Sequence, residues 1–184
     1  MDDPRLRAWQ ILSSEYRVDT KFLRLRADRV ALPSGAVVDE YFVRESRGFA
    51  VAFALTPDDR VLLVRQYKHG VGEVVTELPA GGMDEGESPA ECVARELAEE
   101  TGYTGSAPAF VRTFLTDPTN STSRFHVFVV RDATRTREPQ TDVTEEIEVD
   151  LVPIDEVRAM ALDGRIAAGS QVAAVLVALA YLGR

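Results

Sequence analysis

Cysteine is almost absent from this sequence, since Cys92 is the only one among 184 residues. A single cysteine cannot form a disulfide within the chain, so a disulfide framework is excluded. Histidine is nearly as scarce, with His69 and His126 alone, and without cysteine pairs a structural zinc site is not expected. The fold therefore has to be held by a hydrophobic core, which a chain of this length can bury.

Positive charge is also in deficit, because 21 lysine and arginine residues stand against 30 aspartate and glutamate residues, a net charge of −9. An exposed basic track for nucleic acid is not expected from this balance, so we predict no nucleic-acid partner. A small anionic substrate is still compatible with the acidic chain if divalent cations stand between the two negative charges.

Long hydrophobic runs are missing as well. The longest, VAAVLVALAYL at residues 172–182, is much shorter than the roughly 20 residues that a membrane span needs, and it reads as a buried C-terminal helix. The segment MDDPRLRAWQ has neither the apolar core of a signal peptide nor the pattern of a transit peptide. We therefore expect no membrane partner and a cytoplasmic location.

Short strand-like segments bounded by turn residues fill most of the chain. Between residues 9 and 43 they partly alternate and are interrupted by LPSG, which suggests a small antiparallel sheet. Further strand-like runs (FAVAFAL, VLLVRQY, FVRTFLT, RFHVFVVRD and IEVDLVPI) are mixed with helical ones at residues 88–100, 155–164 and 170–182. This order predicts an α/β fold, with N-terminal strands over residues 1–45 and a larger domain over residues 46–184.

The first of these helices has clear ends and a crowded acidic face. Ser88 and Glu91 form a predicted capping box at its start, and Gly102 stands where a left-handed C-terminal cap is expected. Glu91 and Glu99 lie four residues on either side of Arg95, so these charges can pair.

Glu96 and Glu100 have no such partner, because neither has a lysine or arginine one helical turn away. They share a face at the edge of the buried stripe, where mutual repulsion and the helix dipole cost about 0.3–1 kcal/mol each. A solvated acidic surface is the simplest interpretation of such a helix, and a divalent cation bound between the carboxylates is the other. The residues before the helix decide between the two.

A fixed spacing of glycine, glutamate and arginine joins this helix to the segment before it. Gly81 is followed after five residues by Glu87 and after seven more by Arg95–Glu96, and Leu97, Glu99, Glu100 and Gly102 complete the pattern. The pattern resembles the signature of the Nudix hydrolase superfamily, G-x5-E-x7-R-E-U-x-E-E-x-G-U, where U is usually a bulky aliphatic residue. Tyr103, at the last U, is the one departure.

This resemblance implies a Nudix α/β/α sandwich with a mixed sheet, and Mg2+-dependent cleavage of a pyrophosphate, with Mn2+ as a substitute. Glu96, Glu100 and the backbone carbonyl of Ala80 would be metal ligands, with Glu99 at or next to the metal. The positions that would shape the loop and helix rather than do chemistry are Gly81, Glu87, Arg95 and Gly102. Hard cations on carboxylate oxygens neutralise pyrophosphate charge and activate water, so these residue types suit the reaction.

Beyond this motif, nearly the whole chain resembles the ADP-ribose pyrophosphatase branch. VRQYKHG at residues 64–70 resembles its R-Q-Y-R strand, and Pro118 lies close to a proline that marks ADP-ribose specificity. TEEIEV at residues 144–149 resembles the loop with a late glutamate that is metal ligand or general base. Glu145 or Glu146 would fill that role, and Glu145 is favoured because it lies two residues before the apolar Ile147. The segment with Trp9 resembles the sheet that mediates dimerisation and whose aromatic rings stack on adenine.

The expected substrate is thus ADP-ribose or a related nucleoside diphosphate sugar, cleaved by a homodimer to a nucleoside monophosphate and a sugar phosphate. Arg65 and Lys68 are candidate phosphate contacts, but three residues apart on a strand they face opposite sides, so only one is expected to reach it. Glu77 contacts substrate or forms a salt bridge at a strand end. Because Lys68 replaces an arginine, a dinucleotide or GDP-sugar is an alternative substrate. A nucleotide-sugar-binding module without catalysis and an acidic interaction protein are the rival classes.

Overall fold

The computed structural model describes residues 7–141 and 145–184. The chain divides into two units. The N-terminal unit consists of the described residues up to Arg47 together with Leu115–Arg124, and the larger unit consists of Gly48–Phe114 and Phe125–Arg184.

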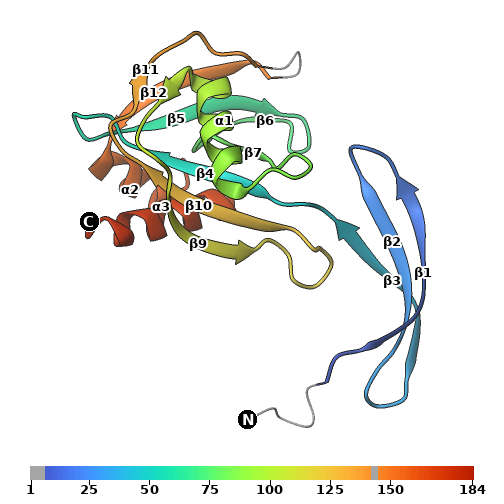
Figure 1. Ribbon diagram of the computed structural model, residues 1–184. Coiled ribbons are helices and arrows are strands. Elements are labelled where there is room, and N and C mark those ends of the chain that lie inside the picture. The colour runs from blue at the N-terminus through green and yellow to red at the C-terminus, as the bar shows by residue number, and fades with distance from the viewer. Residues whose placement is uncertain (1–6, 142–144) are drawn as a thin grey trace. The chain divides into compact units, whose positions relative to one another are not determined.

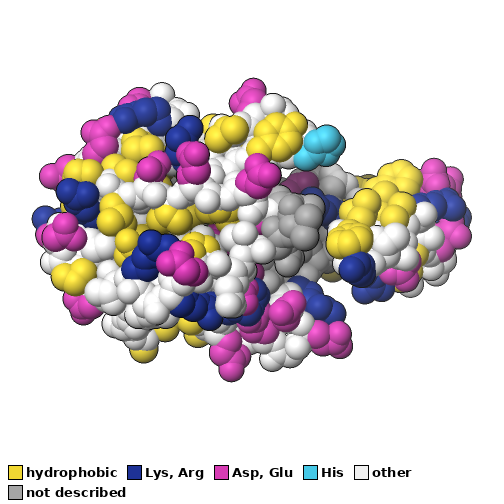
Figure 2. All heavy atoms as spheres, turned by 90° about the horizontal axis from the view of Figure 1, so that it is seen from above, with side chains coloured by type: hydrophobic (Ala, Val, Ile, Leu, Met, Phe, Trp, Pro, Cys, Tyr) yellow, Lys and Arg dark blue, Asp and Glu magenta, His cyan; other side chains and the backbone are white. Residues whose placement is uncertain are grey.

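The N-terminal unit is built on an antiparallel sheet, which confirms the small sheet predicted from the sequence. Its strands are β1 (Gln10–Asp19), β2 (Arg24–Ala31) and β3 (Val37–Glu45), paired in that order (Figure 1). Few of its side chains are buried, chiefly Ala27, Asp28 and Val30. Large apolar side chains stay exposed instead, among them Ile11, Leu12, Phe22, Leu23 and Phe42. Figure 2 shows a group of hydrophobic side chains on the surface of this unit.

A loop from far along the chain completes this unit. Asn120 donates from its side-chain nitrogen to the carbonyl of Phe42 at 2.8 Å, and the Tyr41 hydroxyl donates to the carbonyl of Thr119 at 2.7 Å. These contacts join residues 78 positions apart. No local pattern in the sequence predicts these contacts, which join the loop with Pro118 to the N-terminal unit.

The larger unit is a mixed α/β/α sandwich, as expected (Figure 1). One sheet has the order β7-β4-β10-β9 and comprises β4 (Phe49–Ala54), β7 (Ala80–Gly82), β9 (Ala109–Leu115) and β10 (Arg124–Val130). The other has the order β12-β5-β6 and comprises β5 (Arg60–Lys68), β6 (Glu73–Glu77) and β12 (Ile147–Pro153). Strands β4 and β10 run parallel, whereas β4 and β7 run antiparallel. Two short strands, β8 (Tyr103–Thr104) and β11 (Thr134–Arg135), pair separately.

The helices that cover the sheets of this unit are α1 (Pro89–Thr101), α2 (Ile154–Asp163) and α3 (Gly169–Tyr181). Alternate residues of β4 belong to two different buried clusters. Ala50, Ala52 and Ala54 pack with α1, and these small side chains let the helix lie close to the strand. Val51 and Phe53, with Leu55 just after the strand, pack with α2 and α3. The β4 backbone thus ties α1 to the main core.

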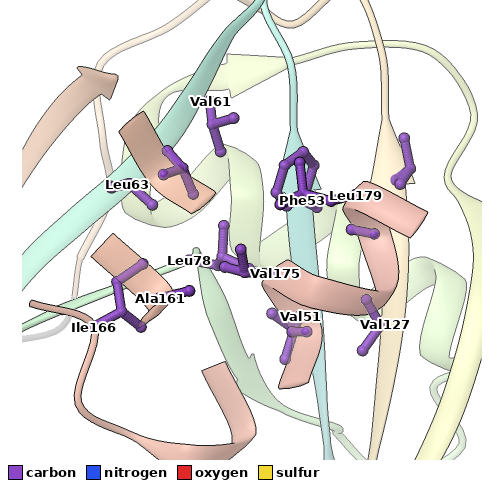
Figure 3. Close-up of a cluster of buried hydrophobic side chains, with 14 of the residues drawn as sticks. Val51, Phe53, Val61, Leu63, Leu78, Val127, Ala161, Ile166, Val175 and Leu179 are labelled. Carbon is purple, nitrogen blue, oxygen red and sulfur yellow. The ribbon is translucent and has the colours of Figure 1, made fainter. Parts of the chain in front are cut away.

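The main core lies between the strands and the C-terminal helices. Figure 3 shows Val51 and Phe53 of β4 close to Val175 and Leu179 of α3, with Val61 and Leu63 of β5 beside them. The apolar run predicted as a buried helix is α3, which confirms that prediction. No helix of the described residues has the length and apolar character to cross a membrane.

Candidate active site

Helix α1 begins and ends where the sequence predicts. The Ser88 hydroxyl accepts a hydrogen bond from the Glu91 backbone nitrogen at 3.3 Å, and the Glu91 carboxylate accepts one from the Ser88 nitrogen at 2.9 Å. Gly102 ends the helix with a φ of 77°, a conformation that favours glycine. Glu91 therefore caps the helix, and the expected pairing of Glu91 with Arg95 is replaced by this cap. Burial of Cys92, Val93 and Leu97 against β4 then fixes which face carries the glutamates.

Glu100 is the most deeply buried of these glutamates, with 5% of the residue exposed. Its carboxylate accepts a hydrogen bond from the backbone nitrogen of Ala80 at 3.0 Å. Burial raises the pKa of Glu100 to about 8, and the charge of Glu96 adds to the rise, while the Ala80 N–H and the charge of Lys68 oppose it. A cation bound nearby would stabilise the charged form of a carboxylate in this position.

Glu96 lies against the backbone of β7. Burial raises its pKa above the ordinary value, the charges of Glu99 and Glu145 add to the rise, and Arg95 opposes it. A Cβ at Gly81 would lie 2.0 Å from both Cδ and Oε1 of Glu96. Only glycine therefore leaves room for this carboxylate beside the strand.

Arg95 connects the glutamates to the loop before the helix. Its guanidinium donates to both carboxylate oxygens of Glu87, at 2.7 and 2.9 Å, and Nη2 also donates to the Gly82 carbonyl at 3.0 Å. Nη1 donates to Glu96 at 2.8 Å and to Glu99 at 3.0 Å. The hydrogen bonds from Arg95 lower the pKa of Glu87 to about 2. The two residues thus hold the loop and the helix in one arrangement.

Arg65 and Lys68, both on β5, have different partners. Lys68 donates to Gln66 Oε1 at 2.5 Å and lies 3.2 Å from Glu77 Oε2, and its charge reaches Glu100. Arg65 pairs instead with Glu148 of β12, at 3.0 Å and exposed. Lys68 and Glu77 therefore belong to the surroundings of the glutamates. The salt bridge, one of the two roles expected for Glu77, is present, and its contact with substrate stays a prediction.

The late glutamates differ in burial. Glu145 is half-buried, and its charge contributes to the raised pKa of both Glu96 and Glu100. Glu146 is exposed. Thr144, at the start of the TEEIEV segment, lies outside the described residues.

Trp9 and Pro118 belong to the N-terminal unit. The Trp9 ring packs edge-on against Tyr41, with centroids 5.4 Å apart, and Pro118 is exposed. Contacts of either residue with a nucleotide stay predictions.

Two buried glutamines are supporting residues that sequence reasoning missed. Gln66 of β5 receives the hydrogen bond from Lys68, and the Gln171 side chain of α3 accepts one from the Leu78 nitrogen at 3.1 Å. A signal for Gln66 was available, because it shares the strand face of Leu62 and Val64, where an apolar residue is expected. The Gln171 contact spans 93 positions and has no local signal.

The donor set fits a hard divalent cation. It offers the carboxylates of Glu96 and Glu100 beside the Ala80 backbone, and both carboxyl groups have a raised pKa that a cation would lower. Within residues 7–141 and 145–184, no three histidine, cysteine, aspartate or glutamate side chains already form a complete metal-binding group. A partial protein set suits Mg2+, which keeps several waters and commonly binds one or two carboxylates together with substrate phosphates.

Two family models match this chain. The NUDIX domain matches residues 46–174, and the nucleoside diphosphate sugar hydrolase N-terminal domain matches residues 9–43. The chain belongs to the Nudix family. The resemblance read from the sequence is thereby confirmed, and Nudix hydrolases generally need a divalent metal.

Individual Nudix relatives resemble the chain over most of its length. An ADP-ribose pyrophosphatase of Mycobacterium tuberculosis is 30% identical over 91% of this chain and 82% of its own length. An ADP-ribose pyrophosphatase of Bacillus subtilis is 29% identical over 79% of this chain and 78% of its own length. The crystal structure of an ADP compounds hydrolase superposes with a TM-score of 0.85, covering 98% of this chain and 97% of that one at 20% identity, so it supports the fold.

Proposed function

We propose that this Nudix protein hydrolyses the pyrophosphate bond of ADP-ribose or a related nucleoside diphosphate sugar, giving a nucleoside monophosphate and a sugar phosphate. The observation that carries the proposal is the pair Glu96 and Glu100, held on one helix face with raised pKa values next to the Ala80–Gly82 strand. The names of the two pyrophosphatase relatives support ADP-ribose as the substrate.

Glu96, Glu100 and the Ala80 carbonyl would hold Mg2+, with Mn2+ as a substitute. When bound, such a cation neutralises phosphate charge and favours ionised water. Arg95 orients Glu96 and Glu99 through its hydrogen bonds, and Glu87 holds Arg95 in place. We assign the chemistry to the carboxylates and the geometry to this arginine.

Lys68 is the basic residue of β5 that we assign to a phosphate oxygen, because its charge reaches Glu100 whereas Arg65 pairs with Glu148. Glu77 holds Lys68 by its ion pair. We assign the late step, as ligand or general base, to Glu145 rather than Glu146, since Glu145 is half-buried and acts on both helix glutamates.

We also propose that residues 1–45 mediate homodimerisation. A sheet of three strands that leaves Ile11, Phe22 and Phe42 exposed needs a further apolar surface to cover it. Trp9 and Pro118 of the same unit are then candidates for the adenine end of the substrate. Sedimentation analysis tests the dimer, and a monomer at micromolar concentration would refute it.

A substrate panel tests the proposed reaction. ADP-ribose, other nucleoside diphosphate sugars, dinucleoside polyphosphates, NADH and nucleoside triphosphates are compared with Mg2+ present. Selective cleavage of ADP-ribose is expected. A preference for triphosphates would overturn the substrate assignment, and tight ADP-ribose binding without turnover under saturating Mg2+ would favour a binding module.

A further inference from the structure

The last turn of α1 has no basic residue. Its backbone carbonyls accept hydrogen bonds from a distant segment of the chain. The Ala98 carbonyl accepts a hydrogen bond from the Gly102 nitrogen at 3.0 Å and a second from Arg137 Nε at 3.2 Å. The Glu99 carbonyl accepts one from the Gln140 nitrogen at 2.8 Å. Residues 136–140, which we call the clasp, thus supply additional donors to a helix end whose last turn has no basic side chain.

Gly102 is where the clasp crosses the helix. Its carbonyl accepts hydrogen bonds from the nitrogens of Thr136, at 2.9 Å, and Arg137, at 3.2 Å. A Cβ at Gly102 would lie 2.2 Å from the Arg137 carbonyl oxygen. Glycine is therefore required twice here, once for its positive φ of 77° and once for the close approach of the clasp.

Arg137 also supplies the charge that the helix end lacks. Its guanidinium lies at the negative end of the helix dipole, where a cation is stabilising. The acidic residues Glu96, Glu99 and Glu100 occupy the same two turns. A positive charge from outside the helix therefore offsets part of the repulsion that this arrangement creates.

Along the chain, the clasp lies between α1 and Glu145. Gln140 is anchored on the Glu99 carbonyl, and Ile147 is paired with Gln66 at the start of β12. Glu145 lies between these anchors, five residues beyond Gln140, and such a stretch spans at most roughly 18 Å. The charge of Glu145 acts on Glu96 and Glu100. The two anchors therefore limit the positions that a carboxylate near these helix glutamates can take.

We propose that the clasp fixes Glu145 relative to the helix glutamates and that Arg137 is its positioning residue. This rests on the proposed function, because it takes Glu145 to act in pyrophosphate cleavage. Arg137 touches neither Glu96 nor Glu100 in the contacts described, and acts through the backbone of α1 and its own segment. Removing the Arg137 side chain should therefore lower turnover only through its effect on the position of Glu145.

The first experiment measures the clasp without reference to activity. Amide hydrogen exchange is followed over residues 136–141 in the wild-type protein, in Arg137→Met and in the matched control Arg135→Met. Arg135 is the neighbouring arginine and pairs with Glu138 at 2.6 Å, both exposed. Exchange about 10-fold faster in Arg137→Met than in Arg135→Met, with the interior of α1 unchanged, is expected. Equal exchange in all three proteins would overturn the clasp.

The second experiment is a double-mutant cycle with ADP-ribose. Arg137→Met should lower kcat about 10-fold with KM within 2-fold, Arg137→Lys should restore part of the loss, and Arg135→Met should stay within 2-fold of the wild type. In a Glu145→Gln background, Arg137→Met should cost less than 2-fold more. An undiminished loss in that background would overturn the role through Glu145. If the wild-type protein cleaves no substrate, the proposed function has failed and, with it, the effect assigned to Arg137 on turnover, whereas the exchange measurement still decides whether the clasp exists.

Discussion

Asp28 and Glu100 are both nearly fully buried, at 3% and 5% exposure, yet their surroundings differ in the sign of charge. In the N-terminal unit, Asp28 receives hydrogen bonds from Arg26 Nε to both oxygens at 2.9 Å and from the Ser14 hydroxyl at 2.5 Å. In the larger unit, Glu100 receives one from the Ala80 nitrogen and faces the charge of Glu96.

The difference separates a carboxylate that holds a fold together from one that is suited to bind a ligand. A buried charge has to be compensated, and Asp28 finds its cation two residues away in the same strand. The charge of Glu96 acts on Glu100 more strongly than the positive charge of Lys68 does. The remaining compensation is best supplied by a cation from solution.

The largest effect is expected for Glu100→Gln. Glutamine can still accept the hydrogen bond from Ala80 but brings no charge, so Mg2+-dependent turnover should fall on the order of 10³-fold, since a metal site contributes several kcal/mol of charge stabilisation. The metal-free variant should unfold at the same temperature as the wild type or higher. Steady-state kinetics and thermal unfolding check this, and full activity would refute the assignment of Glu100 as a ligand.

Gly81→Ala should have the next largest effect. The added Cβ would overlap Glu96 and displace its carboxylate, so we expect about a 100-fold loss of turnover, the scale seen when a metal ligand is misplaced. Gly82→Ala is the matched control, because a Cβ there meets no atom within 4 Å. If both substitutions reduce kcat/KM equally, the contact of Gly81 with Glu96 is not what matters.

Asp28→Asn should lower stability and leave metal binding unchanged, the opposite of what is expected for Glu100→Gln. Asparagine keeps an oxygen that can accept from Arg26 Nε but brings no charge, so the ion pair is lost, and breaking a buried pair costs about 3 kcal/mol of unfolding free energy. Mg2+ affinity, measured by calorimetry, should not change. Glu148→Gln is the control, because its ion pair with Arg65 is exposed and should contribute less than about 1 kcal/mol. Equal stability of the two variants would show that Asp28 is not a structural carboxylate.

Features encoded locally were predictable from the sequence. Ser88, Glu91 and Gly102 mark the ends of α1 by the groups that a helix end needs, and the structure confirms them. The separate N-terminal sheet and the mixed α/β class followed from strand and helix patterns in the same way, whereas the α/β/α sandwich was implied by the Nudix resemblance. The family spacing identified the glutamates, and the mutual burial of Glu96 and Glu100 follows from their shared helix face.

Contacts between distant segments were not predictable. The loop with Asn120 joins the N-terminal unit, and Arg137 reaches a helix 39 positions away, and no periodic pattern announces either. Glu91 was expected to pair with Arg95 because residues four apart on a helix lie close together. In the structure, the Glu91 carboxylate instead accepts a hydrogen bond from Ser88 in the capping box. The homodimer, the cytoplasmic location and the absence of a nucleic-acid partner stay predictions.

The smallest effect concerns Glu87, whose pKa is shifted opposite to that of Glu100. Arg95 holds the Glu87 pKa at about 2, below its ordinary value of 4.5. The stability from this pair is therefore fully present above pH 4.5 and is lost as pH falls toward 2. Glu87→Gln should lower the unfolding free energy by about 1.5 kcal/mol at pH 6, and by less at pH 3.

Glu100, with a pKa of about 8, should show the opposite dependence of stability on pH in the metal-free protein. Its charged form is disfavoured by folding, so Glu100→Gln should gain stability relative to the wild type as pH rises from 5 to 8. Chemical denaturation with EDTA at each pH measures both differences, and slopes of the same sign would contradict the distinction between a paired and an uncompensated carboxylate.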